Sequence, residues 1–315
     1  TQISDGTLVA AVVTFDRVVL VDGHVNVPDP AATHAAAAEL ASQLRHPDHE
    51  QPALVLVFSD GLNINGTSLV HGVCGALPPG TVVAGGLAGD GDHFARTWTL
   101  VGGEPRSHHI TAVALYGPLQ CATGSRGGWG PFGPERRITR ATGQVLYELD
   151  GKPALDLYRE YLGELAAGLP ATALLFPLAV RLDSDDEPPV VRTVLAINEA
   201  EKSMTFAGDI PDGRLARLMR ASHNRLISGA SGAAEAATSA GFDGPSLCLA
   251  ISCVGRRLVL RQRAEEEIEC TAEPLPPGSI QIGFYSYGEI SPSGFERCEL
   301  HNQTMTLTVL RELTP

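Results

Sequence analysis

The chain has 315 residues, 43% of them hydrophobic and 19% charged, and its formal net charge at pH 7 is −13. This length exceeds what one small core needs and predicts two domains. The acidic balance argues against nucleic acid and anionic membranes as partners, because both require a basic surface, and no apolar run reaches the roughly 18–20 residues that cross a bilayer.

The first half of the chain predicts a mixed sheet with helices. Two β-branched runs, Leu8–Thr14 and Arg17–Val21, predict a pair of strands. Asp29 as N-cap predicts an alanine-rich helix over residues 30–44, and the apolar run Ala53–Phe58 predicts a strand buried on both faces. The other expected elements are a helix over Ser68–Ala76 and strands over Val82–Ala84, Thr97–Val101, Ile110–Tyr116, Gln120–Thr123 and Ile138–Leu149. This order predicts a sheet that is partly parallel and partly antiparallel.

The second half begins at the turn Asp150-Gly151, after which Pro153 opens a helix. The predicted helices are Pro153–Leu165, Gly213–Ile227, Ala230–Ala240 and Val254–Glu269. The predicted strands are Ala173–Leu182, Val190–Ile197, Met204–Phe206, Ser246–Ser252, Ser279–Tyr287 and Met305–Leu310, and Asp183–Pro189 is expected to be an acidic loop. The fold class is therefore α/β, with two mixed-sheet α/β halves, residues 1–150 and 151–315, packed together.

A glycine cluster over residues 85–91 follows a predicted strand, where phosphate-binding loops occur. It fits neither G-x-G-x-x-G nor the P-loop. Asp90 is expected to accept N–H bonds within this loop, and His93 and Arg96 follow it directly. The cluster is either a close approach of backbone or a loop that contacts a ligand, and the sequence leaves both interpretations open.

A second glycine-dense stretch, residues 124–133, combines Arg126 with Trp129 and Phe132. A disordered loop rarely contains two large aromatic residues, so packing between the two halves is the favoured interpretation. Contact with a ligand, in which Arg126 would take part, is the alternative.

The stretch Ser252–Arg257 lies where a buried strand passes into a helix, so its backbone N–H groups are expected to point outward. Arg256 at this position opposes the helix macrodipole, which predicts a compensating anion. We expect Glu289 to be that partner, with Arg181 joining them; a ligand carboxylate bound beside Cys253, Arg256 and Tyr287 is the alternative. If the anion is a ligand, Arg256→Ala should abolish its binding and leave the fold intact.

Catalytic and metal-binding patterns are weak. Cys253 at a helix start beside arginines has the setting of a nucleophile, but no general base accompanies it, so we do not predict an enzyme. A single imidazole can bind haem; the candidates are His71, His93 and His223, although C-x-x-C-H is absent.

Four stretches together resemble members of the FIST family, which are bacterial sensory modules with relatives among eukaryotic F-box proteins. They span roughly residues 50 to 310 in the family's order. They are Gly85-Gly86-Leu87-Ala88-Gly89-Asp90-Gly91, Glu148-Leu149-Asp150-Gly151-Lys152-Pro153-Ala154-Leu155-Asp156-Leu157-Tyr158, Ile251-Ser252-Cys253-Val254-Gly255-Arg256-Arg257 and Gly283-Phe284-Tyr285-Ser286-Tyr287-Gly288-Glu289-Ile290. The resemblance implies an N-terminal and a C-terminal FIST domain divided near residue 150.

The resemblance also implies small-molecule sensing, with an amino-acid-like or carboxylate ligand and a signal passed to a partner protein. One alternative that it implies is a haem-based nitric-oxide sensor that regulates a histidine kinase or a cyclic-di-GMP enzyme in trans. The second alternative is a protein-interaction scaffold.

The location is expected to be cytoplasmic, because the six cysteines form neither a C-x-x-C pair nor a compact disulfide framework. The sequence starts at Thr1 with neither a basic n-region nor an apolar h-region. Whether an N-terminal segment was removed stays open.

Overall fold

The computed structural model of the chain describes residues 2–7, 9–181, 189–293 and 297–313. Within these residues it contains two nine-stranded sheets and one two-stranded sheet. The predicted α/β class, built from two halves packed together, is confirmed. No helix in the described part of the chain is long and apolar enough to span a membrane.

The large sheet has the strand order β1-β6-β2-β3-β18-β17-β20-β7, with β19 paired to β18. Its strands are β1 (Val19–Asn26), β2 (Leu54–Ser59), β3 (Val82–Ala88), β6 (His109–Tyr116), β7 (Leu119–Arg126), β17 (Leu247–Cys253), β18 (Ile280–Ser293), β19 (Arg297–His301) and β20 (Met305–Glu312). The pairs β2–β3 and β17–β18 are parallel, and the other pairs are antiparallel.

The two halves of this sheet repeat one topology. In each half an antiparallel outer pair, β1–β6 or β7–β20, flanks a parallel pair joined through helices, β2–β3 or β17–β18. The halves meet where β3 pairs antiparallel with β18. The second repeat of the large sheet therefore begins with β7, directly after Gly117 and Pro118, and the small sheet is inserted between β7 and α4.

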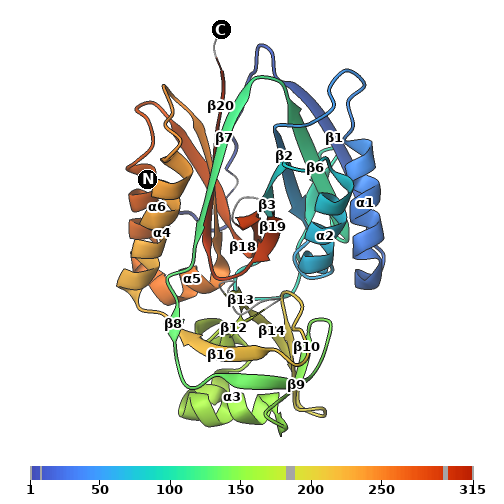
Figure 1. Cartoon of the computed structure of the whole chain (residues 1–315). Coiled ribbons are helices and arrows are strands. Elements are labelled where there is room, and N and C mark those ends of the chain that lie inside the picture. The colour runs from blue at the N-terminus through green and yellow to red at the C-terminus, as the bar shows by residue number, and fades with distance from the viewer. Residues whose placement is uncertain (1, 8, 182–188, 294–296, 314–315) are drawn as a thin grey trace.

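Helices cover the two outer sides of the large sheet (Figure 1). They are α1 (Thr33–Gln43) and α2 (Gly66–Ala76) on one side, and α4 (His223–Thr238) and α6 (Ala264–Ala272) on the other, with α5 (Val254–Leu260) below α4. The sheet curls, so that its inner faces meet in one core that joins Leu54 and Leu115 of the first half to Leu310 of the second. Alternate residues of β2 serve the two sides, since Val55 and Val57 face the helix side.

The small sheet lies beneath the large one, with α3 (Ala154–Leu162) under it (Figure 1). Its strand order is β13-β12-β16-β9-β10-β15-β14, with β11 paired to β10 and β8 to β16. The strands are β8 (Gly130–Pro131), β9 (Arg136–Thr142), β10 (Val145–Leu149), β11 (Lys152–Pro153), β12 (Leu178–Val180), β13 (Val190–Arg192), β14 (Val194–Asn198), β15 (Ser203–Phe206) and β16 (Leu215–Arg220). Residue 150 lies in the turn between β10 and β11, and the division of the chain there stays a prediction.

The remaining elements are short. They are the hairpin β4 (Thr99–Val101) and β5 (Glu104–Arg106) and the 3₁₀ turns η1 (Pro30–Ala32), η2 (Gly163–Gly168), η3 (Ala171–Leu175) and η4 (Arg261–Arg263). The two aromatic residues of the second glycine-dense stretch separate: the Trp129 indole N–H donates to Gln303 O at 2.8 Å, whereas Phe132 packs against Phe176 in the small-sheet core.

Several sequence predictions are wrong. The described residues of Leu8–Thr14 form no strand, and Val9 and Val12 are exposed. Gly213–Ile227 is not one helix: β16 occupies its first part, because Ala216 and Leu218 alternate toward the small-sheet core, and α4 begins at His223.

Four further predicted elements are divided in the structure, and the first is Val190–Ile197, which forms β13 and β14. Gly143 turns Ile138–Leu149 into a hairpin of β9 and β10. Val254–Glu269 breaks at Arg261, where φ is +50°. Ala173–Leu182 contains η3 and the short β12, while Leu182 and most of the acidic loop Asp183–Pro189 lie outside the described residues.

Close packing of α4 on β7 depends on Gly124, where an added Cβ would overlap the carbonyl oxygen of Ala233. Gly124→Ala is therefore expected to lower the free energy of unfolding by at least about 2 kcal/mol. Gly232→Ala is the control, because its nearest neighbour would be Arg126 Cγ at 3.9 Å, and alanine favours the helix by up to about 1 kcal/mol. Chemical denaturation measures both; equal effects would contradict the close packing.

Candidate functional site

The ends of three strands meet beside the middle of β18. An added Cβ at Gly61, just after β2, would overlap Ala88 O at the end of β3 and would lie 3.0 Å from the Tyr287 ring. One at Gly89 would lie 3.1 Å from Tyr285 O and 3.2 Å from Val254 Cγ2, which follows β17. The carboxyl ends of both parallel pairs thus converge where the two repeats join. In open α/β sheets this is the position at which ligands bind.

Asp90 lies at the centre of this convergence of strand ends. Its carboxylate accepts backbone N–H bonds from Ala95 and Arg96, each at 2.8 Å, and a hydrogen bond from the Tyr287 hydroxyl. The Phe94 ring stacks on the Tyr287 ring with centroids 4.8 Å apart and planes 10° apart. We call Asp90, Phe94 and Tyr287 the Asp90 cluster.

The cluster holds its carboxylate charged. Burial acts to raise the pKa of Asp90, but the bonds from the Arg96 N–H, the Tyr287 hydroxyl and the Ala95 N–H outweigh it, so the pKa lies below its usual value. Burial, followed by the Asp90 bond, raises the pKa of Tyr287. The cluster therefore presents a fixed anion beside an aromatic face.

Polar residues of the loop that carries Asp90 remain accessible. Asp90 and Phe94 are half-buried, and His93 and Arg96 are exposed. The structure thus brings together Asp90, His93, Arg96 and Tyr287 of the predicted ligand residues. Near Gly89, the Arg257 guanidinium lies 4.8 Å from the Tyr285 ring, and the buried Tyr285 hydroxyl has no hydrogen-bond partner among the described residues.

Asp60 is a buried carboxylate that sequence reasoning did not place in the site. It accepts hydrogen bonds from His108 N at 2.7 Å, Leu62 N at 2.9 Å and the Thr97 hydroxyl. Burial raises the pKa of Asp60, but these hydrogen bonds lower it by more, so the pKa lies below its usual value. Asp60 fixes the loop after β2 to the residues that flank the β4–β5 hairpin. The only signal in the sequence is a lone Asp after a buried strand, a position that favours capping of loop N–H groups.

Arg256 meets a carboxylate, but not the predicted one. It is fully buried and pairs with the fully buried Glu267, with Nε and Oε1 2.6 Å apart. It also donates to Leu226 O at 2.8 Å and to Gly127 O. The prediction of a Glu289 partner is wrong because the chain breaks at Arg261, which lets α6 fold back and present Glu267. With these acceptors Arg256 joins α4, α5, α6 and the segment after β7, a structural role.

Glu289 and Cys253 form a separate buried cluster. Glu289 accepts hydrogen bonds from the Ser286 hydroxyl, from Thr304 N at 3.2 Å and from the Thr304 hydroxyl at 2.8 Å. Burial raises its pKa to about 8, although these bonds and the charge of Arg256 act in the opposite direction. Burial, together with the charge of Glu289, raises the pKa of Cys253. The buried Cys253 thiol therefore lacks the lowered pKa that a nucleophile at this position requires.

Two predicted arginines lie elsewhere, so the predicted meeting of Arg181, Arg256 and Glu289 is wrong. Arg181 follows β12 in the small sheet and pairs with Glu135 at 3.1 Å. Arg126 is exposed at the end of β7 and donates to Ser125 O at 2.9 Å. Sequence spacing did not reveal that β12 belongs to a different sheet from β17 and β18.

The haem candidates are surface residues. His71 lies on the exposed side of α2, His93 is exposed, and the exposed His223 places Nε2 2.9 Å from Val259 O. An axial ligand requires an imidazole that faces an enclosed apolar slot, and these three positions do not fit that requirement. Within the described residues no three His, Cys, Asp or Glu side chains gather as metal ligands.

Two family models match most of the chain. The FIST N domain model matches residues 1–152, and the FIST C domain model matches residues 154–292. The chain belongs to the FIST family. FIST domains are sensory modules that bind small ligands in signal transduction, and the family is not a catalytic one.

Individual relatives add little to this FIST assignment. An uncharacterized protein of Methanocaldococcus jannaschii is 34% identical over 82 residues, which span 26% of this chain and 16% of that protein. A solved cyanuric acid hydrolase of A. caulinodans aligns over 95% of this chain and 100% of its own, with 11% identity and a TM-score of 0.21. That likeness is too low to carry an argument.

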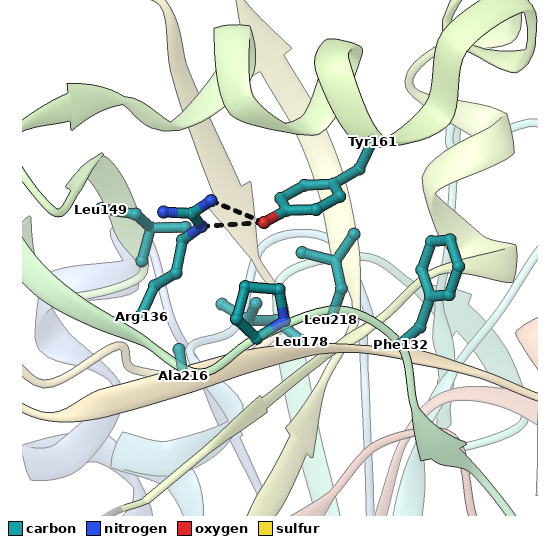
Figure 2. A pocket seen from close by; sticks show the side chains of 8 residues that line it. Phe132, Arg136, Leu149, Tyr161, Leu178, Ala216 and Leu218 are labelled. Atoms are coloured by element: carbon teal, nitrogen blue, oxygen red, sulfur yellow. Dashed lines mark hydrogen bonds between the residues drawn. The ribbon is translucent and has the colours of Figure 1, made fainter.

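Two hollows lie away from the Asp90 cluster of this FIST chain. The first, in the small-sheet core, has a volume of about 10 Å³, room for one water molecule at most. Figure 2 shows Arg136 over it, bonded to the Tyr161 hydroxyl through Nε at 3.0 Å and Nη2 at 2.7 Å. The second is a groove of about 460 Å³ beyond the ends of α1 and α2. It is lined by Arg45, His46, His49, Glu50, Tyr116 and apolar side chains, and it is large enough for a small ligand.

Removal of one member of the buried Arg256–Glu267 pair leaves the other charge without compensation. Arg256→Met is expected to reduce the free energy of unfolding by about 3–5 kcal/mol. Arg140→Gln is the control: Arg140 pairs with Glu148 at 2.9 Å but is 53% exposed, so its loss should cost at most about 1 kcal/mol. Denaturant unfolding curves check both values, and a stable Arg256→Met protein would contradict the structural role.

The raised pKa of Glu289 predicts a pH dependence. The native pKa of about 8 lies above the ordinary 4.5, so the native state keeps a proton that the unfolded state releases. This contribution to stability is complete below about pH 4.5 and is lost as the pH rises through 8, at up to about 1.4 kcal/mol per pH unit. Glu289→Gln should remove this loss, so its stability relative to wild type should rise between pH 5 and 8. Parallel stability profiles for the two proteins would show that Glu289 does not titrate in this range.

Proposed function

We propose that this FIST chain senses a small ligand, amino-acid-like or a carboxylate, at the Asp90 cluster and passes the signal to a partner protein. The observation that carries the proposal is the anchored Asp90 carboxylate beside the stacked Phe94 and Tyr287 rings. It lies where the carboxyl ends of the strands converge, as ligand sites in α/β sheets do.

The side chains around the cluster suit a ligand that carries both charges. Asp90 remains anionic and half-buried, so it can accept bonds from an ammonium group. Arg96 and His93, on the same loop and exposed, are donors for a carboxylate. Phe94 offers its ring to an apolar side chain. A purely anionic ligand would use the arginine and histidine alone, and Asp90 would oppose it.

Transmission to a partner is supported by polar contacts between the two sheets. Asn65 Nδ2 donates to Asp209 Oδ1 at 3.1 Å, and Arg192 Nη1 donates to Leu300 O at 2.8 Å. Polar interfaces of this kind permit relative motion of the parts that they join. The partner that we propose is a signalling protein in trans, a kinase or a cyclic-di-GMP enzyme, in the cytoplasm.

A scaffold function is a second candidate, and one observation favours it. Trp98 and Leu100, two residues apart at the β4–β5 hairpin, are 44% and 54% exposed. Exposed aromatic residues of this kind are common anchors in protein interfaces. The haem-based nitric-oxide sensor has no such support from His71, His93 or His223, and a Soret band in protein expressed with haem supply would be the observation in its favour.

The ligand proposal is tested by thermal shift assays against amino acids and small carboxylates. Wild type is expected to gain several degrees with one ligand class, since occupancy at 100 times Kd adds about 2.7 kcal/mol. Asp90→Asn should need a ligand concentration at least about tenfold higher for the same shift, because the anion that binds the ammonium group is lost. Asp92→Asn, two residues further along the same exposed loop, is the control and should retain the shift.

Two outcomes would contradict this assignment. If Arg45→Gln removes the shift and Asp90→Asn does not, the ligand occupies the groove beyond α1 and α2. If no ligand class shifts the melting temperature while a partner is captured through Trp98, the scaffold function replaces the sensor.

A further inference from the structure

Two of the six cysteines lie together beneath α2. Cys74 is on α2 and Cys298 is on β19, and both pack against the apolar core of the first half. The Cys298 thiol donates a hydrogen bond to the Cys74 sulfur. Cys298 Sγ also lies 3.4 Å from Val83 O of β3, which fixes its position below the helix.

The fold itself brings these thiols together. At the start of α2, an added Cβ at Gly66 would lie 2.8 Å from the methyl groups of Leu300, so Leu300 points at the helix. Cys298 precedes Leu300 by two residues on the same strand and therefore faces the same side. Cys74 lies two turns beyond Gly66 on α2. The contact between the thiols thus lies where α2 packs on β19.

The other four cysteines lack this setting. Burial raises the pKa of Cys121, of Cys248 to about 12 and of Cys270 to about 11, and it also raises that of Cys253. For Cys74 the hydrogen bond from Cys298 lowers the pKa, against burial and the charge of Glu299. Cys74 is also partly exposed. Among the six thiols it is the one that combines access, thiolate character and an adjacent second thiol.

We propose that Cys74 and Cys298 form a reversible disulfide on reaction with a peroxide, which makes this thiol pair an oxidant-responsive site separate from the Asp90 cluster. The Cys74 thiolate attacks one peroxide oxygen, the O–O bond breaks, and the sulfur becomes a sulfenic acid while the leaving oxygen takes a proton to form water or an alcohol. The Cys298 sulfur then attacks the sulfenic sulfur; the S–S bond forms and hydroxide leaves as water with the Cys298 proton. In total two thiols lose two electrons and the peroxide gains them.

This disulfide would join two elements that both contact the small sheet. Asn65, the N-cap of α2, bonds to Asp209, and Leu300 of β19 accepts from Arg192. Oxidation would therefore restrain α2 against β19 at the place where the small sheet rests on them. The site depends on no ligand at the Asp90 cluster.

Peptide mapping of the wild-type chain tests the proposal directly. Trypsin leaves Cys74 in residues 46–96 and Cys298 in residues 298–311, each with a single cysteine. After treatment with hydrogen peroxide and alkylation of remaining thiols, mass spectrometry under non-reducing conditions should find these two peptides linked. Dithiothreitol should release them, and Cys121→Ser should retain the link while Cys74→Ser and Cys298→Ser lose it.

Three results would overturn the proposal. The first is the absence of the linked peptide while Cys74 is recovered alkylated. The second is Cys74 recovered as sulfinic acid, which would mean that Cys298 does not reach it. The third is a link between two Cys74 peptides, which would place the reaction between molecules. Because wild-type protein decides all three, a variant that fails to fold leaves the test intact.

Discussion

The structure depends on the close approach of backbones at the centre of the large sheet, where its two repeats join. Gly85 has φ +144°, and an added Cβ there would overlap Val57 O of the neighbouring strand. At Gly61 a Cβ would overlap Ala88 O. These contacts leave no room for a side chain, and β3 ends against the middle of β18. Only with this spacing does the Tyr287 hydroxyl reach Asp90.

Below this centre the chain buries two charges that a purely apolar core would avoid. Arg256 and Glu267 are both fully buried, and such a pair rarely adds net stability over well-packed apolar side chains. Its geometry offers a reason for its presence: Arg256 donates to the carbonyls of Gly127 and Leu226, and Glu267 accepts from the Ser252 hydroxyl at 3.1 Å. The pair thus fixes five segments at one point: β17, α4, α5, α6 and the residues after β7. We regard the pair as a device for specificity, because its directional hydrogen bonds fix the relative positions of these segments and apolar side chains would not.

Local patterns in the sequence predicted part of this arrangement. The helix after Asp29, the buried strand before Asp60 and the loop centred on Asp90 depend on neighbouring residues, and the structure has each of them. The partner of Arg256 depended on the break at Arg261, where a non-glycine residue adopts a positive φ that periodicity does not reveal. The repeat of the large sheet was hidden because its second copy is interrupted by the small sheet, so the related strands are separated by unequal lengths of chain. Long-range pairing of this kind leaves no periodic trace.

One element joins the Asp90 cluster, Glu289 and the thiol pair. The long β18 pairs with β17, β3 and β19, and its Tyr287 holds Asp90 while its Glu289 is buried on the same strand. The neighbouring strand β19 carries Leu300, whose carbonyl accepts a hydrogen bond from Arg192 of the small sheet. It also carries Cys298, which contacts Cys74. The pairing of β18 with β3 is irregular between Ser286 and Gly288, directly after the last residue that pairs with β17. Tyr287, the β18–β19 pair and Leu300 thus form one continuous hydrogen-bonded connection between Asp90 and Arg192 of the small sheet.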